Sequence, residues 1–376
     1  MKPGTIPDGW TSAPLGELCG RITTGKLDAN AMVADGEYPF FTCARESYRI
    51  NRYAFDTEAL LVSGNGANVG YVHYYKGKFN AYQRTYVLSE FTADVHFLKM
   101  FLDRNLQDRI RVEVNAGNTP YITMGTLTEM GVVLPNDAAE QRAIATALSD
   151  VDGLLGGLDR LIAKKRDLKQ AAMQQLLTGQ TRLPGFNGEW EVKTFGEVAV
   201  PRRERIDPRR ACVHDFCIEL EHIESGSGQL LGSTSTNAQS SLKSVFNLGD
   251  VLFGKLRAYL RKYWRATRHG VCSTEIWVLV PRVDAAMSEF LFQLVQTEAF
   301  IDATSNSYGT HMPRSDWNAV QNYKLSMPPL PEQTAIAAVL SDMDAELAAL
   351  EQRREKTRAL KQAMMQELLT GKTRLI

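Results

Sequence analysis

The feature that most limits what this chain can fold into is a segment of 44 residues that occurs twice. Residues 140–183 align without a gap on residues 332–375, and 26 of the 44 aligned pairs are identical. In both copies apolar residues recur at alternating steps of four and three, which is typical of a narrow coiled-coil seam. Each copy therefore predicts one long helix that needs a partner helix. The seam positions are Ile144, Leu148, Val151, Leu155, Leu158 and Ile162 in the first copy and Ile336, Leu340, Met343, Leu347 and Leu350 in the second.

The simplest partner for each helix is the other copy. Start signals at residues 135–137 and 331–332 and stop signals at residues 178–179 and 370–371 bound the two helices. Only about a dozen residues join the first helix to the next domain, which finishes where the second helix begins, so the connectivity favours an antiparallel pair. At 1.5 Å per residue, a helix of about forty residues is roughly 60 Å long. We therefore expect a pseudo-two-fold dumbbell, in which an antiparallel two-helix coiled coil separates two globular domains.

A second and weaker echo precedes each helix, because WTSAPLGE at 10–17 is similar to WEVKTFGE at 190–197. The chain thus alternates domain, helix, domain, helix. Both domains show a mixed α/β (α+β) pattern, with strands followed by a helix. The expected strands lie in residues 71–90, with a turn at Lys76-Gly77, and in residues 249–264 and 270–281; the expected helices lie in residues 94–113 and 287–303. We expect the two domains at residues 1–134 and 184–327 and the two helical regions at residues 135–183 and 328–376.

Composition excludes several classes of protein. Lys plus Arg and Asp plus Glu both count 43, so any affinity for nucleic acid has to come from local charge. Five scattered cysteines suit reduced thiols, the first residues have no apolar core of signal-peptide length, and nowhere do eighteen apolar residues run together. We therefore expect a cytoplasmic protein without a membrane partner. Hydrolase, metalloprotease and adenine-methyltransferase motifs are absent. The cluster CVHDFCIELEH (212–222) matches no zinc finger. We expect no catalysis, cofactor or metal site in this chain.

Each domain contains a basic, aromatic window without acidic residues, between Glu58 and Glu90 and between Asp250 and Glu275. Lys and Arg suit phosphate oxygens, while Arg, Asn and Gln read base edges through paired hydrogen bonds. The alternative is a pair of solvated strand faces whose aromatic side chains enter the core. The candidate DNA contacts are Asn65, Asn68, His73, Lys76, Lys78, Tyr82, Gln83 and Arg84 in the first window and Lys255, Arg257, Tyr259, Arg261, Lys262 and Glu275 in the second.

Three further motifs carry a family resemblance: PGFNGEW (184–190), PLPEQTAIAAVLSDMD (329–344) with its cognate EQRAIATALSDVD (140–152), and the paired LLTG-x-TRL ends. In this order and spacing the whole chain resembles the specificity subunit of type I restriction-modification enzymes. The resemblance implies two target-recognition domains, residues 1–134 and 184–327, alternating with two conserved helical regions. It also implies a non-catalytic subunit that recognises an asymmetric bipartite site in double-stranded DNA. Its implied partners are two methyltransferase subunits, which bind S-adenosylmethionine. They also include restriction subunits, which depend on ATP and Mg.

The resemblance adds two sets of candidate residues. The tails of the domains, residues 116–135 and 307–329, contribute the DNA contacts Asn118, Thr119, Tyr121, Thr310, His311 and Arg314. The helices contribute exposed positions for methyltransferase docking, namely Gln141, Arg166, Gln170, Gln333, Arg358 and Gln362. Simple solvation of a polar helix face is the alternative for each of these. A coiled-coil assembly protein that bridges two partners without sequence-specific DNA binding is the alternative function.

Overall fold

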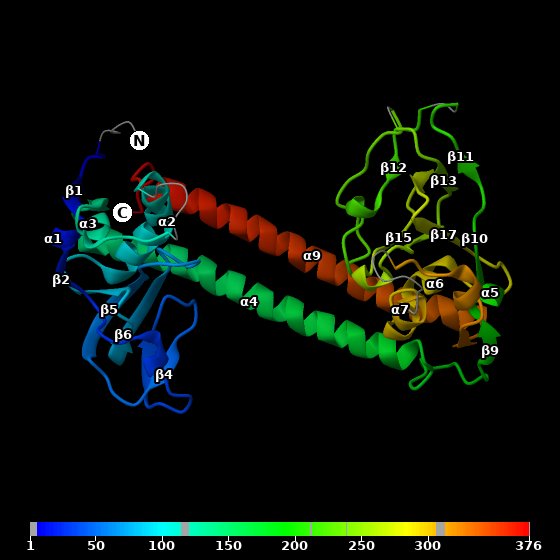
Figure 1. The fold of residues 1–376 in the computed structure, drawn as a ribbon, viewed down its shortest axis with the longest axis horizontal. Coiled ribbons are helices and arrows are strands. Elements are labelled where there is room, and N and C mark those ends of the chain that lie inside the picture. The colour runs from blue at the N-terminus through cyan, green and yellow to red at the C-terminus, as the bar shows by residue number, and fades with distance from the viewer. Residues whose placement is uncertain (1–5, 114–119, 211–212, 238, 306–312, 376) are drawn as a thin grey trace. The chain divides into compact units, whose positions relative to one another are not determined.

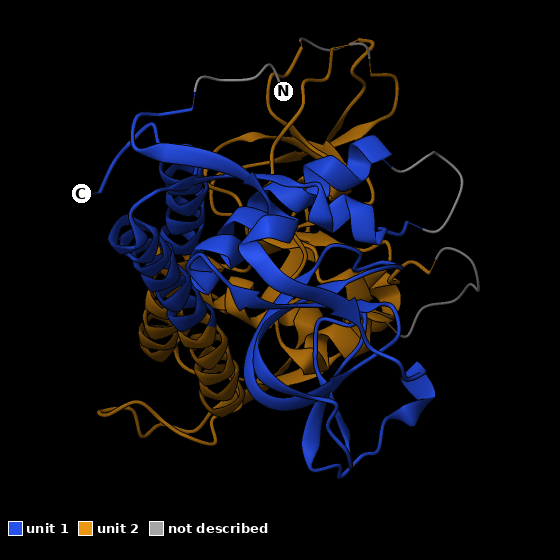
Figure 2. Cartoon of the chain, turned by 90° about the vertical axis from the view of Figure 1, so that its left-hand side faces the viewer, with its two compact units in different colours: residues 1–159, 352–376 blue, residues 160–351 orange. Residues whose placement is uncertain are grey.

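The structure is a computed structural model that describes residues 6–113, 120–210, 213–237, 239–305 and 313–375. The chain divides into two compact units, residues 1–159 with 352–376 and residues 160–351 (Figure 2). The boundary between the units crosses both long helices, α4 (Ala138–Leu176) and α9 (Leu330–Leu368). Each unit therefore contains one α/β domain, together with the start of one helix and the end of the other.

The first unit contains a six-stranded sheet in the order β2-β7-β5-β6-β3-β4. Neighbouring strands are antiparallel except β3 and β6, which are parallel. A separate antiparallel pair, β1 with β8, leads into α4. The elements are β1 (Trp10–Pro14), α1 (Leu15–Leu18), β2 (Cys19–Thr24), η1 (Ala29–Ala31), β3 (Tyr38–Phe41), β4 (Tyr48–Ile50), β5 (Phe55–Ser63), β6 (Val72–Ala81), β7 (Thr85–Phe91), α2 (Val95–Glu113), α3 (Met124–Thr128) and β8 (Gly131–Pro135).

The core of the first unit forms between the central strands and α2. Leu60 of β5 and Leu88 of β7 are fully buried in one cluster with Phe97 and Leu102 of α2. Each such side chain contributes about 1.5–3 kcal/mol when it leaves water. The cluster also includes Leu148 of α4 and the last residues of α9, so the helix ends belong to the core of the domain.

The second unit also has a strand pair that leads into a long helix, but its other strands form two four-stranded sheets in place of one six-stranded sheet. Its sheets have the strand orders β10-β17-β14-β15 and β11-β13-β16-β12, and the pair β9 with β18 leads into α9. The elements are β9 (Glu191–Thr194), α5 (Phe195–Val198), β10 (Ala199–Pro201), β11 (Arg205–Ile206), β12 (Cys217–Ile218), η2 (Leu220–His222), β13 (Lys243–Phe246), β14 (Val251–Gly254), η3 (Ala258–Leu260), β15 (Tyr263–Arg265), β16 (Gly270–Ser273), β17 (Ile276–Pro281), α6 (Ser288–Leu294), α7 (Glu298–Ser305), α8 (Trp317–Val320) and β18 (Lys324–Met327).

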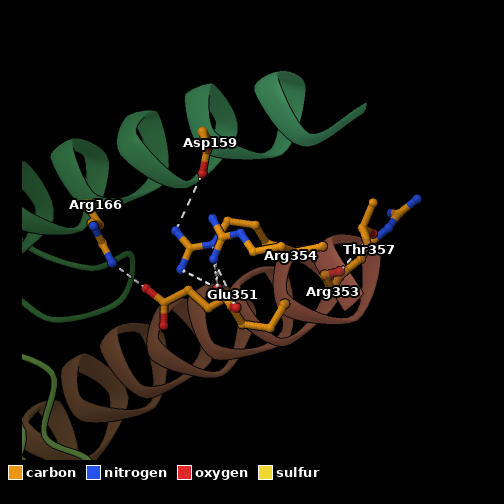
Figure 3. Close-up of polar contacts among 8 residues, drawn as sticks. Asp159, Arg166, Glu351, Arg353, Arg354 and Thr357 are labelled. Carbon is orange, nitrogen blue, oxygen red and sulfur yellow. Dashed lines mark hydrogen bonds and ion pairs between the residues drawn. The ribbon is translucent and has the colours of Figure 1, made fainter. Parts of the chain in front are cut away.

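The long helices α4 and α9 pack together and run antiparallel, as the sequence predicts (Figure 1). In the first unit Asp152 contacts Lys361 at 2.6 Å and Asp159 contacts Arg354 at 3.5 Å. The residue numbers of the contacting pairs increase along α4 and decrease along α9, so the two helices are antiparallel. In the second unit Arg166 of α4 contacts Glu351 of α9 at 2.5 Å (Figure 3). The expected fold class, two mixed α/β domains with paired long helices, is confirmed.

Three local expectations are wrong. The dipeptide Lys76-Gly77 is not a turn, because β6 runs through it and the chain reverses at residues 82–84 instead. Residues 249–264 are not one continuous strand, since η3 separates β14 from β15. The expected helix at 287–303 is broken into α6 and α7.

None of the helices in the described residues has both the length and the apolar character of a membrane-spanning segment.

Candidate nucleic-acid interface

A tight turn follows the central strand β5 of the first unit and joins two distant segments. The Gly64 N–H donates to the Arg84 carbonyl at 2.8 Å, which attaches the turn to the start of β7. The Ile122 N–H donates to the Gly64 carbonyl at 2.9 Å, and the Gly66 N–H donates to the Pro120 carbonyl at 3.1 Å. We call residues 64–71 the turn and residues 120–122 the strap. These hydrogen bonds bring the turn, residues 82–84 and the strap to one place.

The second unit makes the same three connections with different residues. The Lys255 N–H donates to the Glu275 carbonyl at 3.0 Å, the Ser315 N–H to the Lys255 carbonyl at 2.9 Å, and the Arg257 N–H to the Pro313 carbonyl at 2.9 Å. The turn of this unit is residues 255–262 and its strap is residues 313–315. The hydrogen bonds make Gly64 equivalent to Lys255, Asn65 to Leu256, Gly66 to Arg257, Asn68 to Tyr259, Gly70 to Arg261, Arg84 to Glu275 and Tyr121 to Arg314.

In the first unit this arrangement groups four of the predicted DNA contacts. Asn65 of the turn forms an antiparallel backbone β-bridge with Tyr121 of the strap. Gln83 and Arg84 are exposed beside them. A cavity of about 260 Å³ is lined by Gly64, Gln83, Arg84, Tyr86 and Ile122. Tyr121 is 57% exposed, so its ring is available for stacking or hydrogen bonding. Tyr82, which is half-buried, begins the same short reversal.

Two buried hydroxyls lie next to this cavity. Ser63 and Thr85 face each other across β5 and β7, immediately before Gly64 and after Arg84. Both side-chain oxygens are buried and have no hydrogen-bond partner among the described residues. A buried unpaired hydroxyl is costly in protein interiors, and both of these belong to residues that adjoin the cavity lining in the sequence.

The other candidates in the first unit are used within the protein. Asn68 donates its side-chain N–H to the Cys43 carbonyl at 3.0 Å. The His73 ring lies 2.9 Å from the Ala44 carbonyl, and burial lowers the pKa of this histidine below its ordinary value of 6.5. His73 is therefore neutral at physiological pH and adds no charge for phosphate.

The basic residues of β6 lie on the far part of the strand from the turn. Lys76 pairs with Glu58 at 3.7 Å, and Lys78 lies 4.8 Å from the centre of the Tyr53 ring. The register of β5 and β6 also places Asp56 opposite Lys78. Acidic residues of the neighbouring strand therefore offset the charge that the acid-free sequence window indicates.

In the second unit only part of the predicted set lacks a side-chain partner in the part of the chain that the structure describes. The Lys262 ammonium donates to two backbone carbonyls, Arg261 forms an ion pair with Glu298, and Arg314 pairs with Glu275 at 2.8 Å. These contacts fix the turn and the strap. Lys255 is half-buried, while Arg257 and Tyr259 are exposed on the turn. The candidates Asn118, Thr119, Thr310 and His311 lie outside the described residues.

The expected exposure of two helix residues is wrong. Gln141 and Gln333 are only 5% and 1% exposed, because each side chain bonds the backbone of its own domain. Gln141 accepts from the Asp94 N–H at 2.8 Å and donates to the Pro135 carbonyl at 2.8 Å. Gln333 accepts from the Met287 N–H at 2.9 Å and donates to backbone carbonyls in the same way. Both therefore attach a helix start to its domain.

The remaining helix candidates are exposed as expected. They are two equivalent pairs of the duplication, Arg166 with Arg358 and Gln170 with Gln362. Arg166 bonds Glu351 across the helix pair, and Arg358 bonds Glu355 within its own helix at 2.8 Å. Neither glutamine side chain forms a hydrogen bond with the described residues.

The sequence did not predict one pair of ion-pair sites. Arg182, just after α4, forms two hydrogen bonds of 2.5 Å with Glu332, which is fully buried at the start of α9. Trp190 donates to the same carboxylate at 3.1 Å. Arg374 and Glu140 make the equivalent contact at the other helix ends, at 2.5 and 2.6 Å. The identity of these residues in both copies of the duplicated segment was the signal that could have revealed them.

Comparison with known proteins gives matches over nearly the whole chain. The model of the type I restriction modification DNA specificity domain matches residues 7–162 and 187–359. The specificity subunit of the type I restriction enzyme EcoDI from Escherichia coli is 32% identical over 370 residues, which cover 89% of this chain and 81% of that subunit. The two matched stretches each include one domain and a large part of the following helix.

Two solved structures share the fold at low sequence identity. The S subunit of a type I restriction-modification system from M. genitalium superposes with a TM-score of 0.62 at 16% identity, covering 98% of this chain and 97% of that chain. A chain from a structure of complex assembly and conformational transition of the type I system superposes with a TM-score of 0.56 at 16% identity, covering 98% and 99%.

Proposed function

Because this chain belongs to the type I restriction-modification DNA specificity subunits, we propose that each of its domains reads one half of a bipartite DNA sequence through its turn and strap. The protein is the DNA specificity subunit of such a system and is not itself catalytic. In this proposal the substrate is double-stranded DNA. DNA recognition takes place in the cytoplasm, where that DNA is accessible.

One observation carries the proposal: two domains build the same backbone site and fill it with different side chains. The hydrogen bonds of Gly64 and Lys255 to their neighbouring segments correspond one to one. Asn65, Gln83, Arg84 and Tyr121 supply donors, acceptors and a ring in the first domain, and all are of types that contact base edges or phosphates. The second domain presents Arg257 and Tyr259. Equivalent scaffolds with different side chains suit two half-sites of different sequence.

The helix pair supports the proposed partners, two methyltransferase subunits that are joined by restriction subunits. Exposed polar positions on α4 and α9 occur in equivalent places, Arg166 with Arg358 and Gln170 with Gln362. Leu168 and its equivalent Leu360 are also 47% and 55% exposed. Apolar side chains flanked by polar ones are typical of a protein interface. In this arrangement S-adenosylmethionine, ATP and Mg bind to the partner subunits.

The proposal is tested by exchange of side chains in the reconstituted methyltransferase complex. The double variant Gln83→Ala/Arg84→Ala should change the bases recognised in one half-site and leave the other half-site unchanged. Sequencing of methylated bases in genomic DNA reads both halves in one experiment. The matched control is Lys76→Ala/Lys78→Ala, which removes two exposed charges of the same domain away from the turn. Methylation without sequence preference in the unaltered complex would instead support a protein that only bridges its partners.

A further inference from the structure

Two arginines of the second turn have a backbone conformation that side chains disfavour. Arg257 has φ +54° and Arg261 has φ +52°, both in the left-handed region. The only other described residue of this kind that is not glycine is Glu90. In this region the Cβ atom approaches the backbone, so ordinary residues are several-fold rarer there than glycine. An arginine at such a position needs a compensating reason.

The first domain shows that glycine serves this turn. Gly66 and Gly70 occupy the two equivalent positions and both have φ +78°. A Cβ added at Gly70 would approach Ile110 of α2 to 2.5 Å, whereas nothing lies within 4 Å of a Cβ at Gly66. The shape of the turn alone therefore does not require a side chain at either position. The second domain keeps arginine at both.

Contacts among the described residues explain only one of the two arginines. Arg261 pairs with Glu298 at the start of α7, so its side chain joins the turn to a helix. The side chain of Arg257 is exposed and forms no hydrogen bond or ion pair with the described residues. Its backbone is nevertheless held by the strap, through the hydrogen bond from its N–H to Pro313. The Arg257 side chain is therefore exposed to solvent, while its backbone is held in place by the strap.

We propose that Arg257 is a specificity-determining residue of the second domain and that it reads a guanine, donating two hydrogen bonds to the N7 and O6 atoms in the major groove. This inference rests on the proposed function. Because the backbone is held in one conformation, only the side chain of Arg257 has to become ordered when its planar guanidinium donates two hydrogen bonds to the base. Leu256 and Tyr259 lie near this arginine in the same turn, at the positions that Asn65 and Asn68 occupy relative to Gly66 in the first turn.

The test compares the full methyltransferase complex that contains the unaltered chain with complexes that contain Arg257→Gly or Arg257→Lys. We expect one half-site of the unaltered complex to include a guanine that becomes any base in Arg257→Gly, while the other half-site stays the same. Discrimination at that base pair should fall by roughly tenfold or more, the value of one bidentate contact. Arg257→Lys keeps the charge but not the fork, so it should lose most of this discrimination too.

The controls separate the inference from the function on which it rests. Arg203→Gln removes another exposed arginine of the same unit and should leave the recognised sequence intact. Because glycine suits φ +54°, Arg257→Gly should unfold at the same temperature as the unaltered chain or higher. Uniform loss of methylation without a change in sequence would make Arg257 a phosphate contact and overturn the inference. Absence of any bipartite motif with the unaltered chain would overturn the proposed function instead.

Discussion

At the scale of single residues, the buried carboxylates at the helix starts depend on the arginines that pair with them. Glu140 is 1% exposed and accepts two hydrogen bonds from Arg374, whose own side chain is partly exposed. Removing the arginine leaves a charge buried without a partner, whereas removing the charge leaves a guanidinium that water reaches. We expect Glu140→Gln to lower the free energy of unfolding by about 1–2 kcal/mol and Arg374→Ala to lower it further. Urea denaturation measures both. Glu332→Gln and Arg182→Ala should show the same order, and equal losses would contradict it.

A second residue-scale prediction concerns His73. Burial lowers the pKa of its ring below 6.5, so between the folded and the ordinary value the unfolded chain binds more protons than the folded chain. The stability that the neutral ring contributes is therefore lost as the pH falls below about 6.5. His73→Gln keeps a donor for the Ala44 carbonyl and removes the titration. Its unfolding free energy should depend less on pH below 6.5, and an NMR titration of the unaltered chain should place the His73 midpoint below 6.5.

At the scale of helices, the duplicated segment is complementary to itself. Asp152 pairs with Lys361 at 2.6 Å, and Asp344 pairs with Lys169 at 2.5 Å. These are the same two positions in each copy, so one segment supplies both partners of an antiparallel pair. Lys361→Asp should cost about 1 kcal/mol through repulsion, and adding Asp152→Lys should restore most of it. The unfolding free energies of the two single variants and the double variant give the coupling. A coupling near zero would show that this pair does not select the register.

The elements differ in how well their sequence predicts them. Seam periodicity over 39 residues identifies α4 and α9 to within a few positions, because a long repeat averages out local exceptions. The shared turn could not be predicted, since GNGANVGY and KLRAYLRK have only Ala67 and Ala258 in common. Backbone hydrogen bonds to distant segments define it, and these leave no residue pattern. Gln141 and Gln333 were misjudged for a similar reason: polar side chains can be buried when loop amides and carbonyls satisfy them.

At the scale of the whole molecule, the boundary between the units crosses α4 after Asp159 and α9 after Glu351, which are equivalent positions of the duplication. If the two domains read two half-sites, helix length should set the number of bases between them. Seven residues inserted at both points keep the seam in phase and add about 10 Å, or about three base pairs at 3.4 Å each. Methylated-base sequencing should then show the same two half-sites with a longer gap.

The matched control for this experiment places the same seven residues in α4 alone. One helix then has a surplus heptad without a partner, and the pair has to bulge or shift its register. Ion pairs such as Asp152 with Lys361 and Lys169 with Asp344 cannot both form after such a shift. The single insertion should therefore lower the unfolding temperature and give no defined new gap. An unchanged gap in the stable double insertion would separate helix length from DNA spacing and leave only the turns and straps as determinants of the site.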